Sequence, residues 1–334
     1  MSDIAVIDIA GFLSGADLAT APKEVEAAAS SIGFLQVVGH GIPAGPIDAV
    51  YDAMARLAAL DPSAREHVLT GGHPYRGLHR NTDDTGAVRQ ERFLVSRFDD
   101  PLQAVEGGVD PAHADFFSPN LWPELDGFRE AVTTLFGMTR GLARRMMGLF
   151  AVALGLPVDW FEPMIGIDAS TFAANHYPPR PPAGDDCSTR VLFAEHADGN
   201  TLTLLHQRGT YNGLQIQPLD RGGEWIEIPV VDDAFVVNIG ELMTRWTNDA
   251  WPSTRHRVMS SPRDGDARTT LTTFHMPSLD AVVAPLVVCG GDVAAHYEPV
   301  TPYQWERRFI KQGYGRQALT MGTKVQEFIE ALPG

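Results

Sequence analysis

Short segments in which apolar and polar residues alternate fill the middle of the chain, between residues 168 and 278. Such alternation is typical of a strand that packs on a core with one face and meets water with the other. Turn-forming residues separate the segments, as at Gly222-Gly223 and Asp264-Gly265-Asp266. The segments are 201–207, 213–217, 224–229, 234–240 and 269–275. Many short, evenly spaced strands predict a jelly roll of two sheets or a barrel.

Helical patterns flank this β region on both sides. Residues 1–160 are mainly helical in pattern, and residues 290–334 return to helix. The expected helices are 22–31, 44–60, a long helix from after Pro123 to Leu154, 302–313 and 323–331, with strands at 4–9 and 33–43. No repeat and no long linker divides the chain. We therefore predict a single domain over 1–334: an α+β fold whose mainly β core, a distorted double-stranded β-helix (jelly roll) at 168–278, is wrapped by N- and C-terminal helices.

The charge balance limits the partners of the chain. The 26 basic and 42 acidic side chains give a formal net charge of −16, and such a surface repels nucleic acids and anionic membranes. The two cysteines, Cys187 and Cys289, are too few for a disulfide scaffold or a cysteine-rich metal site. The sequence has no run of 18 apolar residues, and its first residues lack the basic start of a secretory signal. We expect a cytoplasmic protein.

His196 and Asp198 begin a candidate metal site. Residues i and i+2 of an extended chain point to the same side, so an imidazole and a carboxylate can converge on one ion. A second histidine, His256, follows 58 residues after Asp198. Two histidines and one carboxylate on one face of an octahedron form the facial triad of non-haem iron(II) oxygenases, which leaves three positions open. Each of these residues alone is more often structural, so the spacing by itself only suggests such a site.

Arg268 and Thr270 form a second candidate group at the start of the 269–275 segment. An arginine that enters an apolar strand is costly to bury without an anion, and its planar fork suits a carboxylate. Thr270 points the same way and can donate a hydroxyl hydrogen bond. Asn175 and Tyr177 share one side of their own segment, and the tyrosine hydroxyl could bind the same carboxylate. Taken alone, Arg268 is better explained by a structural salt bridge, and the Asn175–Tyr177 segment by a turn before a proline-rich loop.

A series of longer motifs extends these observations over most of the chain. The motifs are GFLQVVGHGIP (33–43), NLWP (120–123), NHYPP (175–179), HADGNTLTLLHQ (196–207), GLQIQ (213–217), GEWIEIP (223–229), AFVVNIGELMTRWTND (234–249) and STRHRV (253–258). In this order they resemble the isopenicillin N synthase-like group of iron(II)- and 2-oxoglutarate-dependent dioxygenases. Gly39 stands where that family usually has asparagine. An ordered series of this length is highly specific.

The resemblance implies an enzyme with a metal inside a distorted jelly roll. His196, Asp198 and His256 occupy the positions of the iron(II) ligands in the family. The implied reaction is the hydroxylation, desaturation or cyclisation of a small molecule by dioxygen, while 2-oxoglutarate loses carbon dioxide to give succinate. Ascorbate is an expected stimulant of such turnover, and secondary metabolism is the expected context.

The resemblance also assigns the second group of residues. Arg268 occupies the position that binds the distal carboxylate of 2-oxoglutarate, and Thr270 replaces the serine of the family's Arg-x-Ser pair while keeping a hydroxyl. Tyr177 matches the tyrosine that assists this arginine. Asn175 matches the asparagine near the metal-bound end of the co-substrate.

Two other functions stay open on the sequence. The first is a 2-oxoglutarate-independent oxidase of the isopenicillin N synthase type, in which the Arg-x-Ser pair binds the carboxylate of the substrate itself. The second is a non-catalytic metal-binding protein. The sequence does not identify the substrate, although Tyr75, Phe172, Leu192 and Phe274 are candidates for the substrate wall. We expect a monomer or a weak homo-oligomer.

Overall fold

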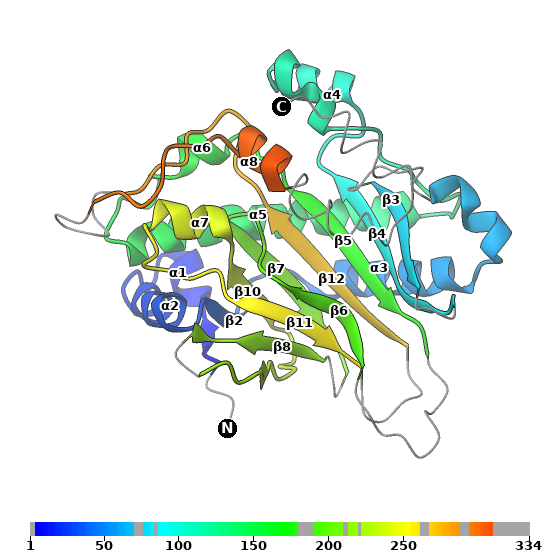
Figure 1. The fold of residues 1–334 in the computed structure, drawn as a ribbon, viewed down its shortest axis with the longest axis horizontal. Coiled ribbons are helices and arrows are strands. Elements are labelled where there is room, and N and C mark those ends of the chain that lie inside the picture. Colours follow the sequence, from blue (N-terminus) through cyan, green and yellow to red (C-terminus); the bar gives the residue numbers. More distant parts are fainter. Residues whose placement is uncertain are drawn as a thin grey trace.

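The computed structural model describes residues 4–69, 76–82, 86–179, 190–209, 213–219, 222–260, 267–286 and 294–309. Two sheets face each other, and helices lie around them (Figure 1). The expected helix at 323–331 and the wall candidate Tyr75 lie outside the described residues. No helix of these ranges is both long and apolar enough to cross a membrane.

The larger sheet contains eight strands of the described chain, in the order β1-β2-β10-β7-β12-β5-β4-β3. Strands β1 and β2 pair in parallel, and all other neighbours pair antiparallel. In chain order the strands are β1 (Val6–Asp8), β2 (Phe34–Val38), β3 (Gly77–Thr82), β4 (Val88–Ser96), β5 (Thr171–Tyr177), β7 (Leu202–Gln207), β10 (Phe235–Ile239) and β12 (Arg268–His275). The N-terminal region therefore contributes half of the strands of this sheet.

The smaller sheet has the order β6-β11-β8-β9. Its strands are β6 (Val191–His196), β8 (Leu214–Gln217), β9 (Ile226–Glu227) and β11 (Arg255–Met259). Phe34 and Val236 of the larger sheet form one apolar cluster with Leu214 and Ile216 of the smaller sheet. Apolar side chains from two facing sheets are the usual filling of a β-sandwich. The α+β prediction with a jelly-roll core is thus confirmed.

One long helix, α5 (Phe128–Ala153), covers the outer face of the larger sheet. Its apolar residues recur every three or four positions, which gives one buried stripe. Gly155 follows the helix in the left-handed backbone conformation, with a φ of 74°, which glycine adopts without strain. The other helices are α1 (Ala10–Ser14), α2 (Thr20–Ser31), α3 (Ala44–Ala59), α4 (Pro101–Glu106), α6 (Glu162–Ile165), α7 (Glu241–Trp246) and α8 (Pro302–Phe309), with 3₁₀ turns at Pro62–Val68 and Pro111–Phe116.

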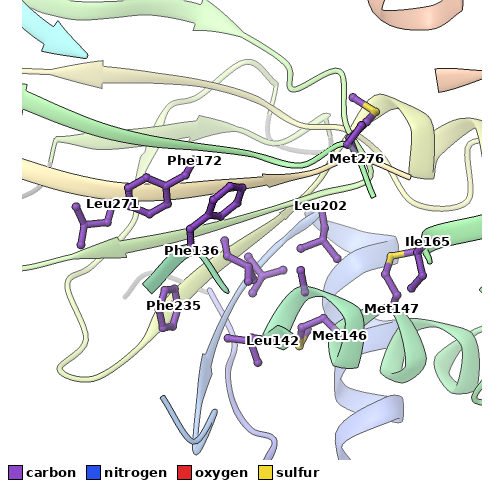
Figure 2. Packing of buried hydrophobic residues seen from close by; sticks show 14 of the residues in the cluster. Phe136, Leu142, Met146, Met147, Ile165, Phe172, Leu202, Phe235, Leu271 and Met276 are labelled. Carbon is purple, nitrogen blue, oxygen red and sulfur yellow. The ribbon is translucent and has the colours of Figure 1, made fainter. Parts of the chain in front are cut away.

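Phe172 belongs to this helix-covered core, so its prediction as part of the substrate wall is wrong. Its side chain is fully buried and its ring lies 5.7 Å from that of Phe136 on α5, centre to centre. Figure 2 shows the two rings among residues of β7, β10 and β12. Successive residues of a strand point to opposite faces. Phe172 therefore points away from the space between the sheets, whereas Asn175 points into it.

Strands β3 and β4 were not expected from the sequence. Their inward-facing residues include the polar His79, Gln90 and Arg92 beside the apolar Leu94, so the alternation does not mark one face as apolar. A strand with polar residues on its inner face lacks the apolar–polar alternation by which a strand is recognised in a sequence. The polar inner face also indicates that this end of the jelly roll is not simply a core.

A buried ion pair joins α5 to the sheet. Asp168 accepts hydrogen bonds from Arg140 on α5, with 2.9 Å between Oδ1 and Nε, and its Oδ2 lies 3.1 Å from the Arg97 guanidinium. Burial acts to raise the pKa of Asp168, but the hydrogen bond and charge of Arg140 outweigh it and lower the pKa to about 2. Because the folded-state pKa is below the ordinary value, the pair stabilises the fold above about pH 4, and this contribution disappears as the pH falls toward 2.

Asp168→Asn is expected to lower the free energy of unfolding by about 3 kcal/mol at pH 7, because it leaves two partly buried arginines without their carboxylate. Urea unfolding of both proteins measures the difference, which should shrink as the pH falls toward 2. Asp159→Asn is the matched control, since Asp159 is exposed. Equal losses in the two variants would contradict the assigned role of Asp168.

Candidate active site

His196, Asp198 and His256 lie together at the edge of the smaller sheet. His196 ends β6, His256 lies on β11, and the two residues face each other in the antiparallel pair. Asp198 follows β6 by two residues, and its Oδ1 lies 3.6 Å from Nε2 of His196 and 3.7 Å from Nε2 of His256. One potential ligand atom from each residue lies within 4.8 Å of the others. Strand pairing thus brings together two histidines that are 60 residues apart in the sequence.

Both imidazole rings are held with Nε2 directed toward the centre of this cluster. Nδ1 of His196 lies 2.9 Å from the carbonyl oxygen of Ala194, and Nδ1 of His256 lies 3.2 Å from that of Thr254. A carbonyl oxygen only accepts, so Nδ1 carries the hydrogen and Nε2 keeps its lone pair. Burial, together with the nearby His196, lowers the pKa of His256 to about 4, so this ring is neutral at neutral pH.

Two hydrogen bonds to Oδ2 orient Asp198. Oδ2 accepts from the Thr203 hydroxyl at 2.6 Å and from the Asn238 amide at 2.9 Å, while Oδ1 faces the two histidines. Burial acts to raise the pKa of Asp198, but the two histidines and the hydrogen bond from Thr203 outweigh it and hold the pKa well below its usual range. The carboxylate is therefore ionised and presents a free oxygen beside two free imidazole nitrogens.

The loop that carries Asp198 is fixed on the first turn of α7. The backbone N–H groups of Gly240, Glu241 and Leu242 donate to the carbonyls of Thr201, Asp198 and Asn200, at 2.8–3.1 Å. A Cβ at Gly240 would lie 2.1 Å from the carbonyl oxygen of Asn200, so this approach requires glycine. Helix α8 adds a bond from the Trp305 indole N–H to the carbonyl of Gly199, at 2.7 Å.

The donor set of the cluster fits a divalent transition metal. Two imidazole nitrogens and one carboxylate oxygen, all buried or half-buried, are the ligands of the non-haem iron(II) facial triad. The hydrogen bonds to the far sides of all three ligands match the way proteins orient metal ligands. Sequence reasoning found the three ligand candidates, but it missed Thr203 and Asn238. The signal for Thr203 was its inward position in the alternating segment 201–207.

The second predicted group lies on two neighbouring strands of the larger sheet. Arg268 of β12 pairs with Tyr177 of β5, and Thr270 pairs with Asn175. The Arg268 guanidinium lies over the Tyr177 ring, 4.8 Å from its centre, and the Asn175 amide donates to the Thr270 hydroxyl at 3.3 Å. All four predicted residues are therefore brought together on the inner face of the sheet.

Gln90 of β4 completes this group, and sequence reasoning missed it. Its amide nitrogen donates to Oδ1 of Asn175 at 3.2 Å and to the Tyr177 hydroxyl at 3.1 Å. Burial raises the pKa of Tyr177, although the Arg268 charge opposes it, so the phenol stays protonated and can donate to an anion. One cation and several hydroxyl and amide groups around it form a site suited to a carboxylate.

Two aromatic residues lie near the metal cluster. Phe274 follows Thr270 and Thr272 on the inner face of β12, and its place in the substrate wall stays a prediction. On the opposite sheet the ring of Phe193, rather than its predicted neighbour Leu192, contacts His196, with 4.7 Å between ring centres. Leu192 is half-buried on β6 and stays a prediction.

Thr203→Val is expected to weaken binding of Mn(II), a stand-in for iron(II), by about 10- to 100-fold, because Asp198 loses one of the bonds that orient it. Isothermal titration with Mn(II) measures the affinity. Thr269→Val is the matched control, since it removes a hydroxyl that meets His176 on the other face of the sheet. Unchanged Mn(II) affinity in Thr203→Val would show that this bond does not support the site.

Comparisons with protein-family models identify the class of protein to which this chain belongs. The description "2OG-Fe(II) oxygenase superfamily" matches residues 169–277, and "non-haem dioxygenase in morphine synthesis N-terminal" matches residues 4–125. These segments hold the jelly roll with the metal cluster and the N-terminal part that completes the larger sheet. The chain belongs to the 2OG-Fe(II) oxygenase superfamily, whose members use iron(II), 2-oxoglutarate and dioxygen.

Individual relatives agree with this membership over nearly the full chain. The 2-oxoglutarate-Fe(II) type oxidoreductase ppzC of Metarhizium majus is 29% identical, with 92% of this chain and 86% of the relative covered. The proline hydroxylase buaE of Petromyces alliaceus is 28% identical, with 87% and 93% covered. The protein is thus a non-haem iron(II), 2-oxoglutarate-dependent dioxygenase, as the sequence motifs indicated.

Solved structures share the fold. A 2OG-Fe(II) oxygenase family protein from Caulobacter crescentus superposes with a TM-score of 0.80 at 24% identity, over 93% of this chain and 100% of the other. A dioxygenase for auxin oxidation from rice superposes with a TM-score of 0.69 at 20% identity, over 93% of this chain and 96% of the other. These likenesses extend over nearly the whole length of the chain, so they include both sheets and the flanking helices.

Proposed function

We propose that His196, Asp198 and His256 hold the iron(II), and that the chain is one catalytic domain which oxidises a small molecule. The convergence of two free imidazole nitrogens and one free carboxylate oxygen within 4.8 Å carries the proposal. Iron(II) bound there would supply the activation of dioxygen, coupled to the decarboxylation of 2-oxoglutarate to succinate. Hydroxylation is the outcome favoured by relatives such as a proline hydroxylase.

The second part of the proposal concerns the co-substrate. Arg268 binds the distal carboxylate of 2-oxoglutarate through its guanidinium fork, and the Thr270 and Tyr177 hydroxyls donate to the same carboxylate. Asn175, held by Gln90 and Thr270, faces the metal-proximal end. The order of these residues along β12 and β5 supports one elongated ligand that is gripped at its far end.

Turnover of 2-oxoglutarate tests this function directly. With iron(II) and ascorbate, the protein is expected to consume oxygen and form succinate only when 2-oxoglutarate is present. Oxygen uptake that is unchanged without 2-oxoglutarate would instead support an oxidase of the isopenicillin N synthase type. Iron(II) binding with neither oxygen uptake nor succinate would support a non-catalytic metal-binding protein.

The proposal includes the setting of the protein. The net charge of −16 favours a small-molecule substrate over nucleic acids or anionic membranes. We also propose that the protein is cytoplasmic and that it is a monomer or a weak homo-oligomer. Sedimentation of the purified protein at several concentrations measures the oligomeric state.

A further inference from the structure

Arg92 is a cation inside the jelly roll that has no assigned part in the metal cluster or the co-substrate site, although its charge acts on Tyr177. It lies on β4 opposite Asn175 of β5, so both side chains point into the space between the sheets. Its guanidinium carbon lies 5.3 Å from the ring centre of Phe274 on the larger sheet and 5.9 Å from that of Phe193 on the smaller sheet. Contacts with both sheets show that Arg92 lies between them.

Only one aromatic ring separates Arg92 from the candidate metal ligands. Phe193 contacts the His196 ring, with 4.7 Å between centres. Phe274 pairs with Thr203, whose hydroxyl donates to Asp198. Arg268 begins β12 six residues before Phe274, which is about 20 Å along an extended strand. Arg92 is in register with Asn175 and Thr270, two positions from Arg268, but its guanidinium reaches along the sheet to the Phe274 end of β12.

No carboxylate of the described residues matches the charge of Arg92. Among the described residues no carboxylate forms an ion pair with it, and its buried Nε has no hydrogen-bond partner there. The adjacent Glu91 points to the opposite face, where it pairs with Arg65 and Arg80. Placing a guanidinium group in a partly buried site without an anion costs free energy. A ligand that brings a negative charge would remove this cost.

His79 adds a polar group beside Arg92. The two residues face each other in the pairing of β3 with β4. Burial, with a smaller effect of the Arg92 charge, lowers the pKa of His79 to about 3, so the imidazole is neutral at neutral pH. Its Nε2 is buried and has no hydrogen-bond partner in the described part of the chain. The ring also hydrogen-bonds the backbone of Arg76, so Nδ1 carries the hydrogen and Nε2 keeps its lone pair. Nε2 can therefore accept a hydrogen bond but cannot donate to an anion, which leaves the Arg92 guanidinium as the anion-binding group.

We propose that Arg92 binds a carboxylate of the primary substrate, and that Phe193 and Phe274 contact its apolar body. The inference rests on the proposed function, because it takes the metal cluster as the reaction centre. It narrows the substrate class to small carboxylic acids with an apolar or aromatic part. Anchoring the charged end beside the cluster would fix which C–H bond is presented for oxidation.

The test uses two probes of the same shape, phenylacetate and the uncharged phenylacetamide. Protein loaded with Mn(II) and saturated with 2-oxoglutarate broadens the proton NMR lines of a probe that binds near the metal. For the wild type, broadening is expected to be about tenfold stronger for phenylacetate, as for a charge-assisted contact. Arg92→Gln is expected to remove this preference. Arg89→Gln, on the same strand but the opposite face, is expected to keep it.

Several outcomes would overturn the proposal. Equal effects of the wild type on the two probes, or a preference that persists in Arg92→Gln, would show that Arg92 does not select a carboxylate. If Arg92→Gln instead weakens 2-oxoglutarate binding, Arg92 belongs to the co-substrate site around Arg268 and Tyr177. If Mn(II) itself fails to bind, which titration in the absence of probes detects, the metal site is wrong and this inference fails with it.

Discussion

Asp198→Ala is expected to abolish succinate formation and to weaken metal binding by more than ~100-fold, beyond the ~10- to 100-fold loss typical when only a ligand's hydrogen-bond partner is removed. Asp198 supplies the only anionic donor of the cluster, and both histidines are neutral donors. Its removal leaves two imidazoles, which bind a hard divalent ion poorly without a carboxylate. Titration with Mn(II) and a succinate assay with iron(II) measure the two effects separately.

Glu195→Ala is the control for this prediction. It removes one negative charge three residues from Asp198, but from an exposed side chain that pairs with Arg255 at the surface. It should retain metal binding and turnover. The circular dichroism spectrum of Asp198→Ala checks that the variant is folded. Succinate formation at the wild-type rate by folded Asp198→Ala would refute the ligand assignment.

Arg268→Ala is expected to weaken 2-oxoglutarate binding by ~2–5 kcal/mol, roughly 30-fold to several thousand-fold in Kd, because the distal carboxylate loses its charged partner. Metal binding should not change, since Arg268 lies on the larger sheet and the two histidine ligands lie on the smaller one. Calorimetric titration of the Mn(II)-loaded protein with 2-oxoglutarate measures the Kd. Arg268→Lys should give an intermediate loss, since it keeps the charge but not the planar fork.

Two variants make this result specific. Arg257→Ala removes a cation whose guanidinium lies over Trp225, 3.9 Å from the ring centre, and should leave the Kd unchanged. Thr270→Ser keeps the hydroxyl and should bind 2-oxoglutarate like the wild type. An unchanged Kd in Arg268→Ala would mean that the arginine serves the fold and that the co-substrate is held elsewhere.

Local pattern was enough to find several strands of the β core and the ligand candidates. The period-two segments at 201–207 and 234–240 correspond to β7 and β10. His196 and Asp198 stay close because His196 ends β6 and Asp198 follows it by two residues. The helices at 22–31 and 44–60 correspond to α2 and α3 for the same reason. Each of these features depends on residues that are close in sequence.

Local pattern failed where inner-face residues are polar or where contacts are distant. Strand β4 was missed because Gln90 and Arg92 occupy the inward positions that apolar residues usually mark. Phe172 was assigned to the wrong side, since an aromatic residue on a strand does not reveal which face the helix covers. The bond from Asn238 to Asp198 joins residues 40 positions apart.

The sequence by itself determined the class of the protein: alternating segments predict a jelly roll, and an ordered set of motifs with His196, Asp198 and His256 indicates an iron(II)- and 2-oxoglutarate-dependent dioxygenase. Only the tertiary structure decided how the side chains meet. Antiparallel pairing sets His196 opposite His256 and Arg268 beside Tyr177, and the stacking of two sheets brings Arg92 to Phe193. The sequence shows residue types and the spacing of nearby residues directly. The register between strands and the way two sheets face each other depend instead on the packing of the whole core.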